Sequence, residues 1–330
     1  MRKFCCILIL LFATVGIASE IYGQKIVSND KRFDKLLPKD AKLEKLAEGY
    51  KWVEGPVWNF KEGYLLFSDI PNNSIFKIAN GSVSLFLKPS GYTGKEVFTG
   101  REPGSNGLTY DVQGRLISCE HGDRRVARLE KDGTKITLID RYEGKRLNSP
   151  NDLVFKSNGD LYFTDPPYGL PKIMSDPAKE LDFQGVYRLS KDGKLTLLTK
   201  EIMFPNGIAF SPDEKTLYVS STGKDASIYA FAVKKDGTLG EKKIVFDANA
   251  QPDTGRGAPD GMKIDKNGYV YSGALGGIAV IDPKDGKLLG RFEFGVPTAN
   301  CAWGDDGSVL YITSNTAIYR IKLKTKGIIK

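Results

Sequence analysis

One short phrase recurs six times along the chain and constrains its fold more than any other feature. Each copy begins with a residue whose side chain carries oxygen, alternates apolar residues into a Gly, Asp or Asn turn, and ends in a β-rich run. The copies read EGPVWNFKEGYLLFSD, NGLTYDVQGRLISCE, NDLVFKSNGDLYFTD, NGIAFSPDEKTLYVSS, DGMKIDKNGYVYSGA and NCAWGDDGSVLYITS. Their starts lie 52, 45, 55, 54 and 40 residues apart. These periods are typical of β-propeller blades.

Each copy alternates apolar and polar residues around a tight turn, which predicts a β-hairpin. A second hairpin pattern follows most copies, as in SIFKIANGSVSLFL and GVYRLSKDGKLTLLT. Two hairpins per period make a four-stranded antiparallel sheet, and six such sheets around an axis make an all-β, six-bladed β-propeller. The last copy is followed only by TAIYRIKL and a short tail, so we expect Lys42–Glu48 to supply its outer strand. A two-sheet sandwich or two separate β domains would not explain six equally placed phrases.

The first 23 residues have the pattern of a secretory signal peptide. A basic start at Arg2 and Lys3 precedes an apolar run, Phe4–Ile17, that is too short to span a bilayer comfortably. Small residues after this run offer cleavage points, and we expect a mature chain that begins near Gln24. Residues 24–330 are then predicted to form a single propeller domain that is secreted or periplasmic, without stable membrane insertion after cleavage. An uncleaved N-terminal anchor is the alternative.

Composition argues against several other classes of protein. Hydrophobic residues make up 41% and charged residues 27% of the chain, which is an ordinary globular composition. Removal of residues 1–23 leaves a net charge of 46 − 39 = +7, with both signs interspersed, so we expect no nucleic-acid binding. Cys119 and Cys301 would remain, each in an apolar context that favours a buried free thiol. With one histidine in the chain, neither a zinc site nor a conventional serine triad is expected.

The first position of the six phrases forms the most informative set of residues. It holds, in chain order, Glu54, Asn106, Asn151, Asn206, Asp260 and Asn300. Quasi-rotational symmetry places these side chains at one height around the axis, at the mouth of the central channel. A ring of carboxylate and amide oxygens suits a hard cation, Ca²⁺ more than Mg²⁺, and two carboxylates balance one divalent charge. Asn and Asp also cap turns, but six oxygen carriers out of six, one of them Glu, are hard to explain in that way.

Several longer motifs carry a family resemblance over roughly residues 45–325. EGPVW, PGSNGL, SPNDLVF, FPNGIAFSPDEKTLYVS and PDGMKIDKNGYVYSG resemble the SMP-30/gluconolactonase/LRE-like proteins, and CEHGDRRV with FTDPPYGL is most similar to the bacterial gluconolactonase branch. The resemblance implies a six-bladed propeller that hydrolyses sugar lactones with one catalytic divalent ion. It implies that Glu54, Asn151, Asn206 and Asp260 hold the ion and that Asp260 also activates the attacking water. Asn106 and Asn300 would then contact water or substrate.

Three further candidates for substrate binding lie on segments expected near the mouth. His121, in CEHGDRR, is a candidate base or substrate donor, although a lone histidine is more often structural. Arg101, in TGREPGSNG, would hydrogen-bond sugar hydroxyls or a carboxylate, and Tyr168, in DPPYG, would form part of a pocket wall. An exposed loop residue and turn packing are the respective alternatives. We expect specificity to depend on the loops Ser90–Pro103, Pro166–Phe183 and Ala248–Pro259.

Together these patterns predict a calcium-dependent lactonase that acts on a small sugar lactone such as glucono-1,5-lactone. The ion would polarise the lactone carbonyl while Asp260 assists the attack of water. Mg²⁺, Mn²⁺ or Zn²⁺ are possible substitutes in vitro. One alternative keeps the site and changes the substrate to another lactone or a phosphotriester. The other is a non-catalytic ligand-binding or scaffold propeller with a structural ion. The sequence does not predict an oligomeric state.

Overall fold

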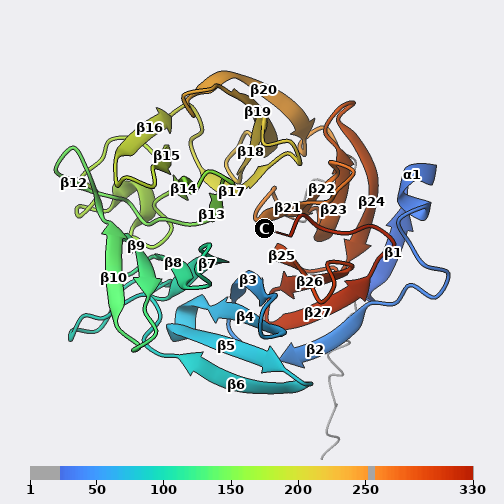
Figure 1. The fold of residues 1–330 in the computed structure, drawn as a ribbon, viewed down its shortest axis with the longest axis horizontal. Helices are drawn as coiled ribbons and strands as arrows, with labels where there is room; N and C mark the ends of the chain where they lie inside the picture. Colours follow the sequence, from blue (N-terminus) through green and yellow to red (C-terminus); the bar gives the residue numbers. More distant parts are fainter. Residues whose placement is uncertain (1–22, 252–256, 330) are drawn as a thin grey trace, which may run out of the picture.

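The computed structural model describes residues 23–251 and 257–329 of the chain. Six antiparallel sheets stand around a central axis, and each runs from an inner strand at the axis to an outer strand at the rim (Figure 1). The predicted six-bladed β-propeller is therefore confirmed. Each recurring phrase supplies the two innermost strands of its blade, because the apolar alternation within the phrase buries one strand face against each neighbouring blade.

Blades 1 to 3 are built from consecutive strands. Blade 1 comprises β3 (Val53–Asn59), β4 (Tyr64–Asp69), β5 (Ser74–Ala79) and β6 (Ser82–Leu87). Blade 2 comprises β7 (Ser105–Tyr110), β8 (Leu116–Glu120), β9 (Arg125–Leu129) and β10 (Lys135–Ile139). Blade 3 comprises β13 (Leu153–Phe155), β14 (Leu161–Asp165), β15 (Gly185–Leu189) and β16 (Leu195–Thr199). A small hairpin of β11 (Arg141–Tyr142) and β12 (Lys145–Arg146) links blades 2 and 3.

Blades 4 to 6 complete the circle, the last two with help from the N-terminal region. Blade 4 comprises β17 (Pro205–Phe210), β18 (Thr216–Ser221), β19 (Ser227–Val233) and β20 (Leu239–Asp247). Blade 5 comprises β21 (Met262–Ile264), β22 (Val270–Ala274), β23 (Gly277–Asp282), β24 (Lys287–Glu293) and β1 (Lys25–Ser28). Blade 6 comprises β25 (Thr298–Gly304), β26 (Val309–Ser314), β27 (Ala317–Lys322) and β2 (Glu44–Glu48).

The N-terminal region closes the ring and protects an outer edge. β2 pairs with β27, with Glu44 opposite Arg320, and the Arg320 Nε donates to Glu44 Oε2 over 2.9 Å. The expected closure by residues near 42–48 is therefore confirmed. Blade 5 differs from the expected four strands, because β1 adds a fifth strand to the outer side of β24. This addition covers a strand edge that would otherwise present unpaired backbone groups.

Helical structure in the described residues is limited to short turns. They are α1 (Lys31–Asp34) and the 3₁₀ turns η1 (Ile70–Asn72) and η2 (Ile173–Ser175). Asp30 caps α1 by accepting the Arg32 N–H at 2.8 Å. Phe33 of α1 is buried, and its ring centroid lies 5.4 Å from that of Phe292 in β24. The helix thus packs its one apolar side chain against blade 5.

Apolar packing occurs between the blades. In the described part of the chain, six clusters of buried residues are found, and each joins two neighbouring blades. Phe67 of blade 1 and Tyr311 of blade 6 belong to one such cluster, for example. Cys119 and Cys301 are buried free thiols, as predicted. Because every blade is held on two sides, the inner strand ends are fixed relative to one another.

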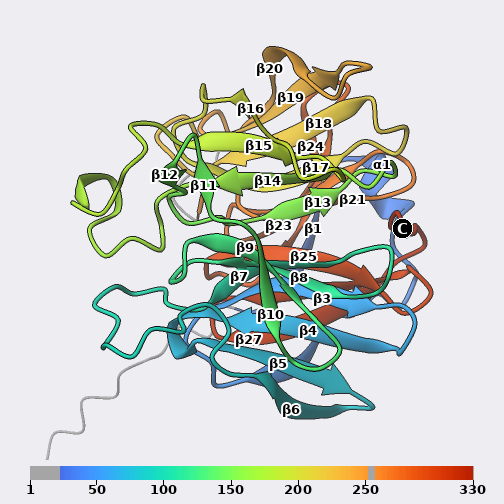
Figure 2. The same ribbon diagram turned by 60° about the vertical axis from the view of Figure 1, so that its left-hand side comes forward.

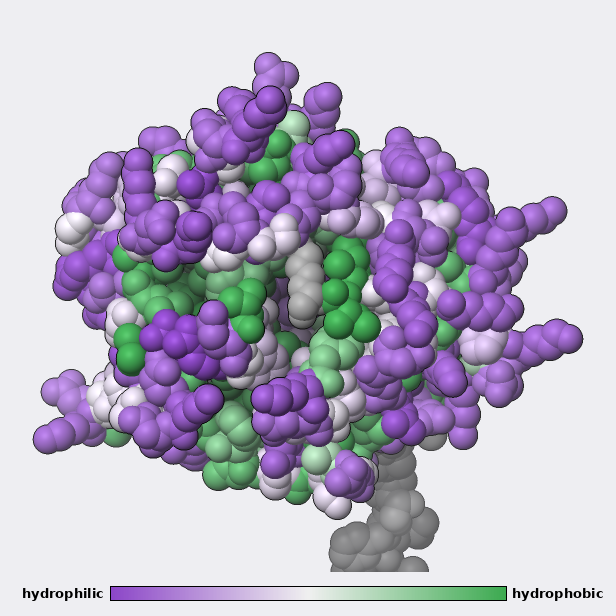
Figure 3. Space-filling view, viewed as in Figure 1, coloured by the Kyte–Doolittle hydropathy of each residue, from purple (hydrophilic) through white to green (hydrophobic). Residues whose placement is uncertain are grey.

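The two ends of the channel differ. Near the C terminus, Gly327 pairs with Asp265, after β21, and its N–H donates to the Gly307 carbonyl, after β25. The C terminus thus lies at the far ends of the inner strands, and Figure 2 shows the long loops before β7 and after β14 on the other side. The face that carries the C terminus is mostly hydrophilic at its rim and hollowed near its centre, where hydrophobic side chains gather (Figure 3).

Two predictions fall partly or wholly outside this description. Residues 1–22, which contain most of the predicted signal peptide, and residues 252–256 of the third mouth loop lie outside the described residues. In the described ranges, no helix is long and apolar enough to cross a membrane.

Candidate active site

The six predicted ring residues lie together where the inner strands begin. Four lie within the first three residues of an inner strand, and two lie two residues before one: Glu54, Asn106, Asn206 and Asn300, then Asn151 and Asp260. Between blades 6 and 1, Asn300 Nδ2 donates to Glu54 Oε2 at 3.2 Å. Between blades 2 and 3, the Gly107 N–H donates to the Asn151 carbonyl at 2.8 Å. The sequence symmetry therefore corresponds to a ring of residues that are neighbours from blade to blade.

Hydroxyl groups from the second strands hold the backbone of this ring. Ser68 in β4 donates to the Asn106 carbonyl of the next blade at 2.9 Å. In the same way, Thr164 in β14 donates to the Asn206 carbonyl of blade 4 at 2.7 Å. Ser220 in β18 donates to the Asp260 carbonyl of blade 5 at 2.8 Å. Because each bond crosses between blades, the ring position of one blade is fixed by its predecessor.

The carboxylates of the ring are in an electrostatically unfavourable position. Burial, partly offset by the Gly55 N–H that donates to Oε2, raises the pKa of Glu54 from 4.5 to about 7. Burial, followed by the nearby carboxylates of Glu54 and Asp152, raises the pKa of Asp260 well above its usual range. Asp260 Oδ1 is buried and has no hydrogen-bond partner among the described residues. A buried carboxylate oxygen without a partner calls for a cation or a proton.

The donor set fits a hard divalent cation. Glu54 and Asp260 offer carboxylate oxygens, Asn151 and Asn206 offer amide oxygens, and a cation among them would offset the repulsion between the carboxylates. No group of three or more His, Cys, Asp and Glu side chains in the described ranges is arranged to hold a metal. An ion at the ring would therefore depend on the amide oxygens as well as the two carboxylates.

The structure brings two of the three loop candidates to the ring. Tyr168 stacks on Phe204, with centroids 5.9 Å apart, and its hydroxyl hydrogen-bonds to Thr222. Burial is the main cause of its raised pKa, and the nearby Asp260 carboxylate adds to it. His121 is fully buried, after the end of β8. Arg101 is exposed on the loop before β7, so its contact with substrate stays a prediction.

Sequence reasoning missed two carboxylates of this site. Asp152 follows Asn151 at a position where four other blades have glycine and blade 6 has Cys301. Its Oδ1 accepts the Leu153 N–H at 2.9 Å, while its buried Oδ2 has no hydrogen-bond partner in the described part of the chain. This departure from the Asn-Gly pattern was the available signal. Glu102 lies 2.9 Å from His121, measured from Oε2 to Nδ1, and no repeat marks it because it lies in a loop.

Known proteins resemble this chain over most of its length. The profile of the SMP-30/Gluconolactonase/LRE-like region matches residues 52–316. The chain belongs to this family. It is 38% identical to a gluconolactonase from Zymomonas mobilis over 312 residues, which cover 92% of this chain and 87% of that protein.

Two solved structures have a fold similar to that of this chain. A gluconolactonase from Xanthomonas campestris is 34% identical, with a TM-score of 0.78, covering 90% of this chain and 94% of that one. A protein from Agrobacterium tumefaciens described as a calcium-binding protein, regucalcin, is 19% identical, with a TM-score of 0.69, covering 88% and 96%. The second likeness concerns the fold alone.

Proposed function

We propose that this protein hydrolyses sugar lactones, with glucono-1,5-lactone as the representative substrate. The observation that carries the proposal is the buried oxygen ring at the channel mouth, in which Asp260 Oδ1 has no hydrogen-bond partner among the described residues. Its relatives from Zymomonas mobilis and Xanthomonas campestris are gluconolactonases, which supports the choice of substrate class. A lactone carbonyl needs both a positive centre for its oxygen and a base for the attacking water.

We propose Ca²⁺ as the resident ion, held by Glu54, Asn151, Asn206 and Asp260. An all-oxygen set of two carboxylates and two amides, without thiolate or imidazole, is chemistry that Ca²⁺ accepts with irregular geometry. When bound, the ion polarises the lactone carbonyl and stabilises the negative charge that develops on its oxygen. Mg²⁺, Mn²⁺ and Zn²⁺ are substitutes to test in vitro.

The chain's own residues position the substrate and transfer the proton. Glu54 is the fixed carboxylate, because the Gly55 N–H and the Asn300 amide both donate to its Oε2. Asp260 Oδ1 takes the proton of the attacking water while the water oxygen bonds to the carbonyl carbon. The bond from that carbon to the ring oxygen then breaks, which opens the lactone. Asn106 and Asn300 complete the ring and orient the substrate.

We also propose that the protein is exported, with residues 1–23 removed. The support is the basic start, apolar run and small residues of the N-terminal sequence. Mass spectrometry of protein recovered from the periplasm or medium is expected to give an N terminus near Gln24. Recovery of the full-length chain from the membrane fraction would contradict this.

The function is tested with the metal-stripped mature protein and glucono-1,5-lactone, after subtraction of spontaneous hydrolysis. Added Ca²⁺ is expected to restore activity, and Asp260→Asn is expected to lower kcat by about 10²–10⁴-fold, the range of general base catalysis. Asp192→Ala, at an exposed turn of blade 3, is the control and is expected to retain activity. Full activity of Asp260→Asn would overturn the base assignment. A folded, Ca²⁺-binding protein that hydrolyses no lactone would overturn the lactonase proposal.

A further inference from the structure

A histidine–carboxylate pair stands beside the oxygen ring. The backbone N–H of His121 donates to the Gly104 carbonyl at 3.1 Å, and this bond joins the end of β8 to the segment that leads into β7. Glu102 lies two residues before Gly104 on that segment. Its Oε2 consequently lies 2.9 Å from His121 Nδ1. The contact thus links the segment before β7 to the segment after β8, and both strands belong to blade 2.

The surroundings of His121 place it at the rim of the ring. A Cβ on Gly169, the residue after Tyr168, would lie 2.5 Å from the His121 Cβ and 2.9 Å from the Ser149 Cβ. Ser149 lies two residues before Asn151. Gly169 therefore packs against both His121 and Ser149, so that His121 lies beside the segment that carries Tyr168 and near the segment that carries a predicted metal ligand. The Glu102 carboxylate is close enough to add to the effect of burial in raising the pKa of Asp260.

His121 differs from an ordinary structural histidine in one respect. Its side chain is fully buried, yet neither Nδ1 nor Nε2 has a hydrogen-bond partner among the described residues, and the Glu102 carboxylate 2.9 Å from Nδ1 is an ion-pair contact. Buried polar atoms in native proteins nearly always have a partner in the protein or in ordered water. An unpartnered imidazole nitrogen beside the Tyr168 segment therefore has hydrogen-bonding capacity left for a ligand.

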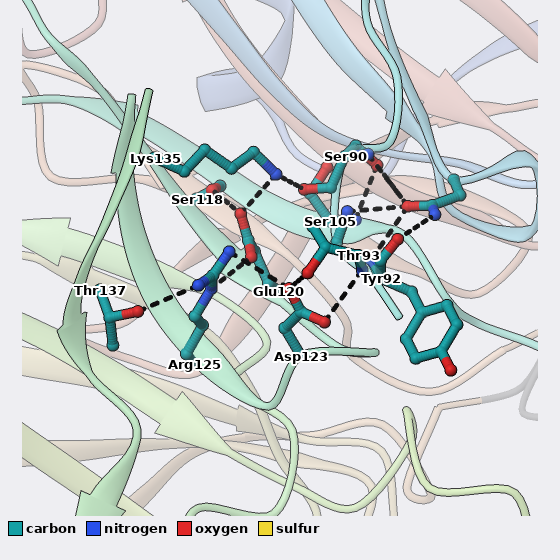
Figure 4. Close-up of polar contacts among 12 residues, drawn as sticks. Ser90, Tyr92, Thr93, Ser105, Ser118, Glu120, Asp123, Arg125, Lys135 and Thr137 are labelled. Carbon is teal, nitrogen blue, oxygen red and sulfur yellow. Dashed lines mark hydrogen bonds and ion pairs between the residues drawn. The ribbon is translucent and has the colours of Figure 1, made fainter. Parts of the chain in front are cut away.

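The backbone that carries His121 is held firmly. The preceding residue, Glu120, is buried and lies 2.7 Å from both Arg125 Nε and Lys135 Nζ, and Lys135 also donates to the Ser90 carbonyl of the mouth loop (Figure 4). Ser90 Oγ in turn accepts the Ser105 N–H at 3.0 Å, at the start of β7. This network joins β8, β10 and the loop before β7. The backbone position of His121 is therefore held by its neighbours before substrate binds.

We propose that Glu102 and His121 form a proton-transfer pair that completes the lactonase site, an inference that rests on the proposed function. Glu102 is the positioning residue: its carboxylate favours the imidazolium with one proton on Nδ1, and the second proton, on Nε2, is the one transferred. His121 is the catalytic residue: as the bond from the carbonyl carbon to the ring oxygen breaks, that oxygen takes the electron pair and receives the Nε2 proton. The proton that Asp260 took from water returns to Nε2 through solvent, which balances the cycle.

The test compares substrates that differ in their leaving oxygen. Glucono-1,5-lactone opens to an alcohol, whose oxygen needs a proton, whereas dihydrocoumarin opens to a phenol, whose oxygen leaves without one. His121→Asn is expected to lower kcat for gluconolactone by about 10²–10⁴-fold and to leave kcat for dihydrocoumarin within about 10-fold. Glu102→Gln is expected to show the same selectivity with a smaller loss, and Glu102→Asp to recover part of it. Glu96→Gln, exposed on the same loop, is the matched control.

The single histidine permits a readout that does not depend on turnover. A protein without a histidine tag gives one set of imidazole signals in a long-range ¹H–¹⁵N spectrum. Addition of gluconate is expected to shift the Nε2 signal, and Glu102→Gln is expected to favour the neutral imidazole over the imidazolium. An Nε2 signal that ignores gluconate, or equal losses on both lactones in a variant that still melts cooperatively and binds Ca²⁺, would overturn the pair's role. A wild type inactive on every lactone would instead contradict the proposed function.

Discussion

At the level of single residues, the glycines that follow the ring positions determine how tightly the mouth closes. A Cβ on Gly55, whose φ is +51°, would overlap the Asn106 carbonyl of the next blade. A Cβ on Gly261 would overlap the Asn300 side chain. The recurring Asn-Gly and Asp-Gly pairs therefore have a steric role besides turning the chain, because they let neighbouring inner strands approach closely.

This crowding predicts the effect of Gly261→Ala. The added methyl group has to displace the Asn300 amide, which donates to Glu54, so we expect a loss of about 1–3 kcal/mol in the free energy of unfolding and weaker Ca²⁺ binding. Urea unfolding and calorimetric titration with Ca²⁺ measure the two effects. Gly240→Ala in β20 is the control, since its nearest contact would be an ordinary 3.4 Å. Equal stability of the two variants would contradict the steric role.

The sequence allowed single site residues to be predicted only where the sixfold repeat of the blades applies. The ring was predictable because six blades repeat one phrase, so that equivalent positions must meet at the axis. Glu102 was not, because its position depends on the path of a loop that no repeat specifies. Asp152 was readable in principle as the one acidic residue at a glycine position. Its buried, unpartnered oxygen depends on the assembled blades, which the sequence does not show.

At the level of elements, charged side chains of blade 2 connect its strands to the loop before β7. Glu120 at the end of β8 is buried between Arg125 of β9 and Lys135 of β10 (Figure 4). Burial raises the pKa of Glu120, and the two cations offset part of that rise. A buried carboxylate of this kind is costly when a partner is removed, although a fully apolar replacement is often tolerated.

This arrangement predicts a non-additive pair of variants. Lys135→Met leaves Glu120 with one cation and is expected to lower the free energy of unfolding by about 3 kcal/mol. The double variant Glu120→Gln with Lys135→Met is expected to lie closer to the wild type, because it removes the unpaired charge. Chemical denaturation of all four proteins completes the cycle, with Lys131→Met at an exposed turn as the control. Additive losses would mean that the two groups do not interact.

Strand order was largely predictable, and the exception has a physical cause. The hairpin periodicity gave four strands per blade, and the short final blade required an outer strand from elsewhere, which β2 provides. The fifth strand of blade 5 was not foreseen, because β1 is short and half exposed and has no clear alternation. Its place follows from the open edge of β24, which depends on the assembled sheet.

At the level of the whole molecule, the mouth makes stability depend on pH in the metal-free state. Burial, above all, raises the pKa of Glu54 to about 7 and raises those of Asp152 and Asp260. A carboxyl group whose pKa is higher in the folded state than in the unfolded state does not destabilise the protein at a pH below the unfolded-state pKa. As the pH rises from there toward the folded-state pKa, the group destabilises the folded state more and more. The metal-free protein is therefore expected to lose stability between about pH 4.5 and 7.

Calorimetry with a chelator tests this expectation. The metal-free protein should melt at a higher temperature at pH 5.5 than at pH 7.5, and saturating Ca²⁺ should remove most of the difference, because a bound cation favours the charged carboxylates. Glu54→Gln should flatten the metal-free pH dependence. The same slope in the wild type and this variant would show that Glu54 is not its source.

The closure of blade 6 has a consequence for how the protein is made. Glu44 and Arg320, which pair across β2 and β27, are 276 residues apart, so β2 is synthesised before the blades and can pair only after β27 has been made. Contacts of such long sequence separation form slowly. Until then, β2 and the edge of the newest blade are both open to other chains. A chain that stalls before β27 is thus a row of blades that cannot close.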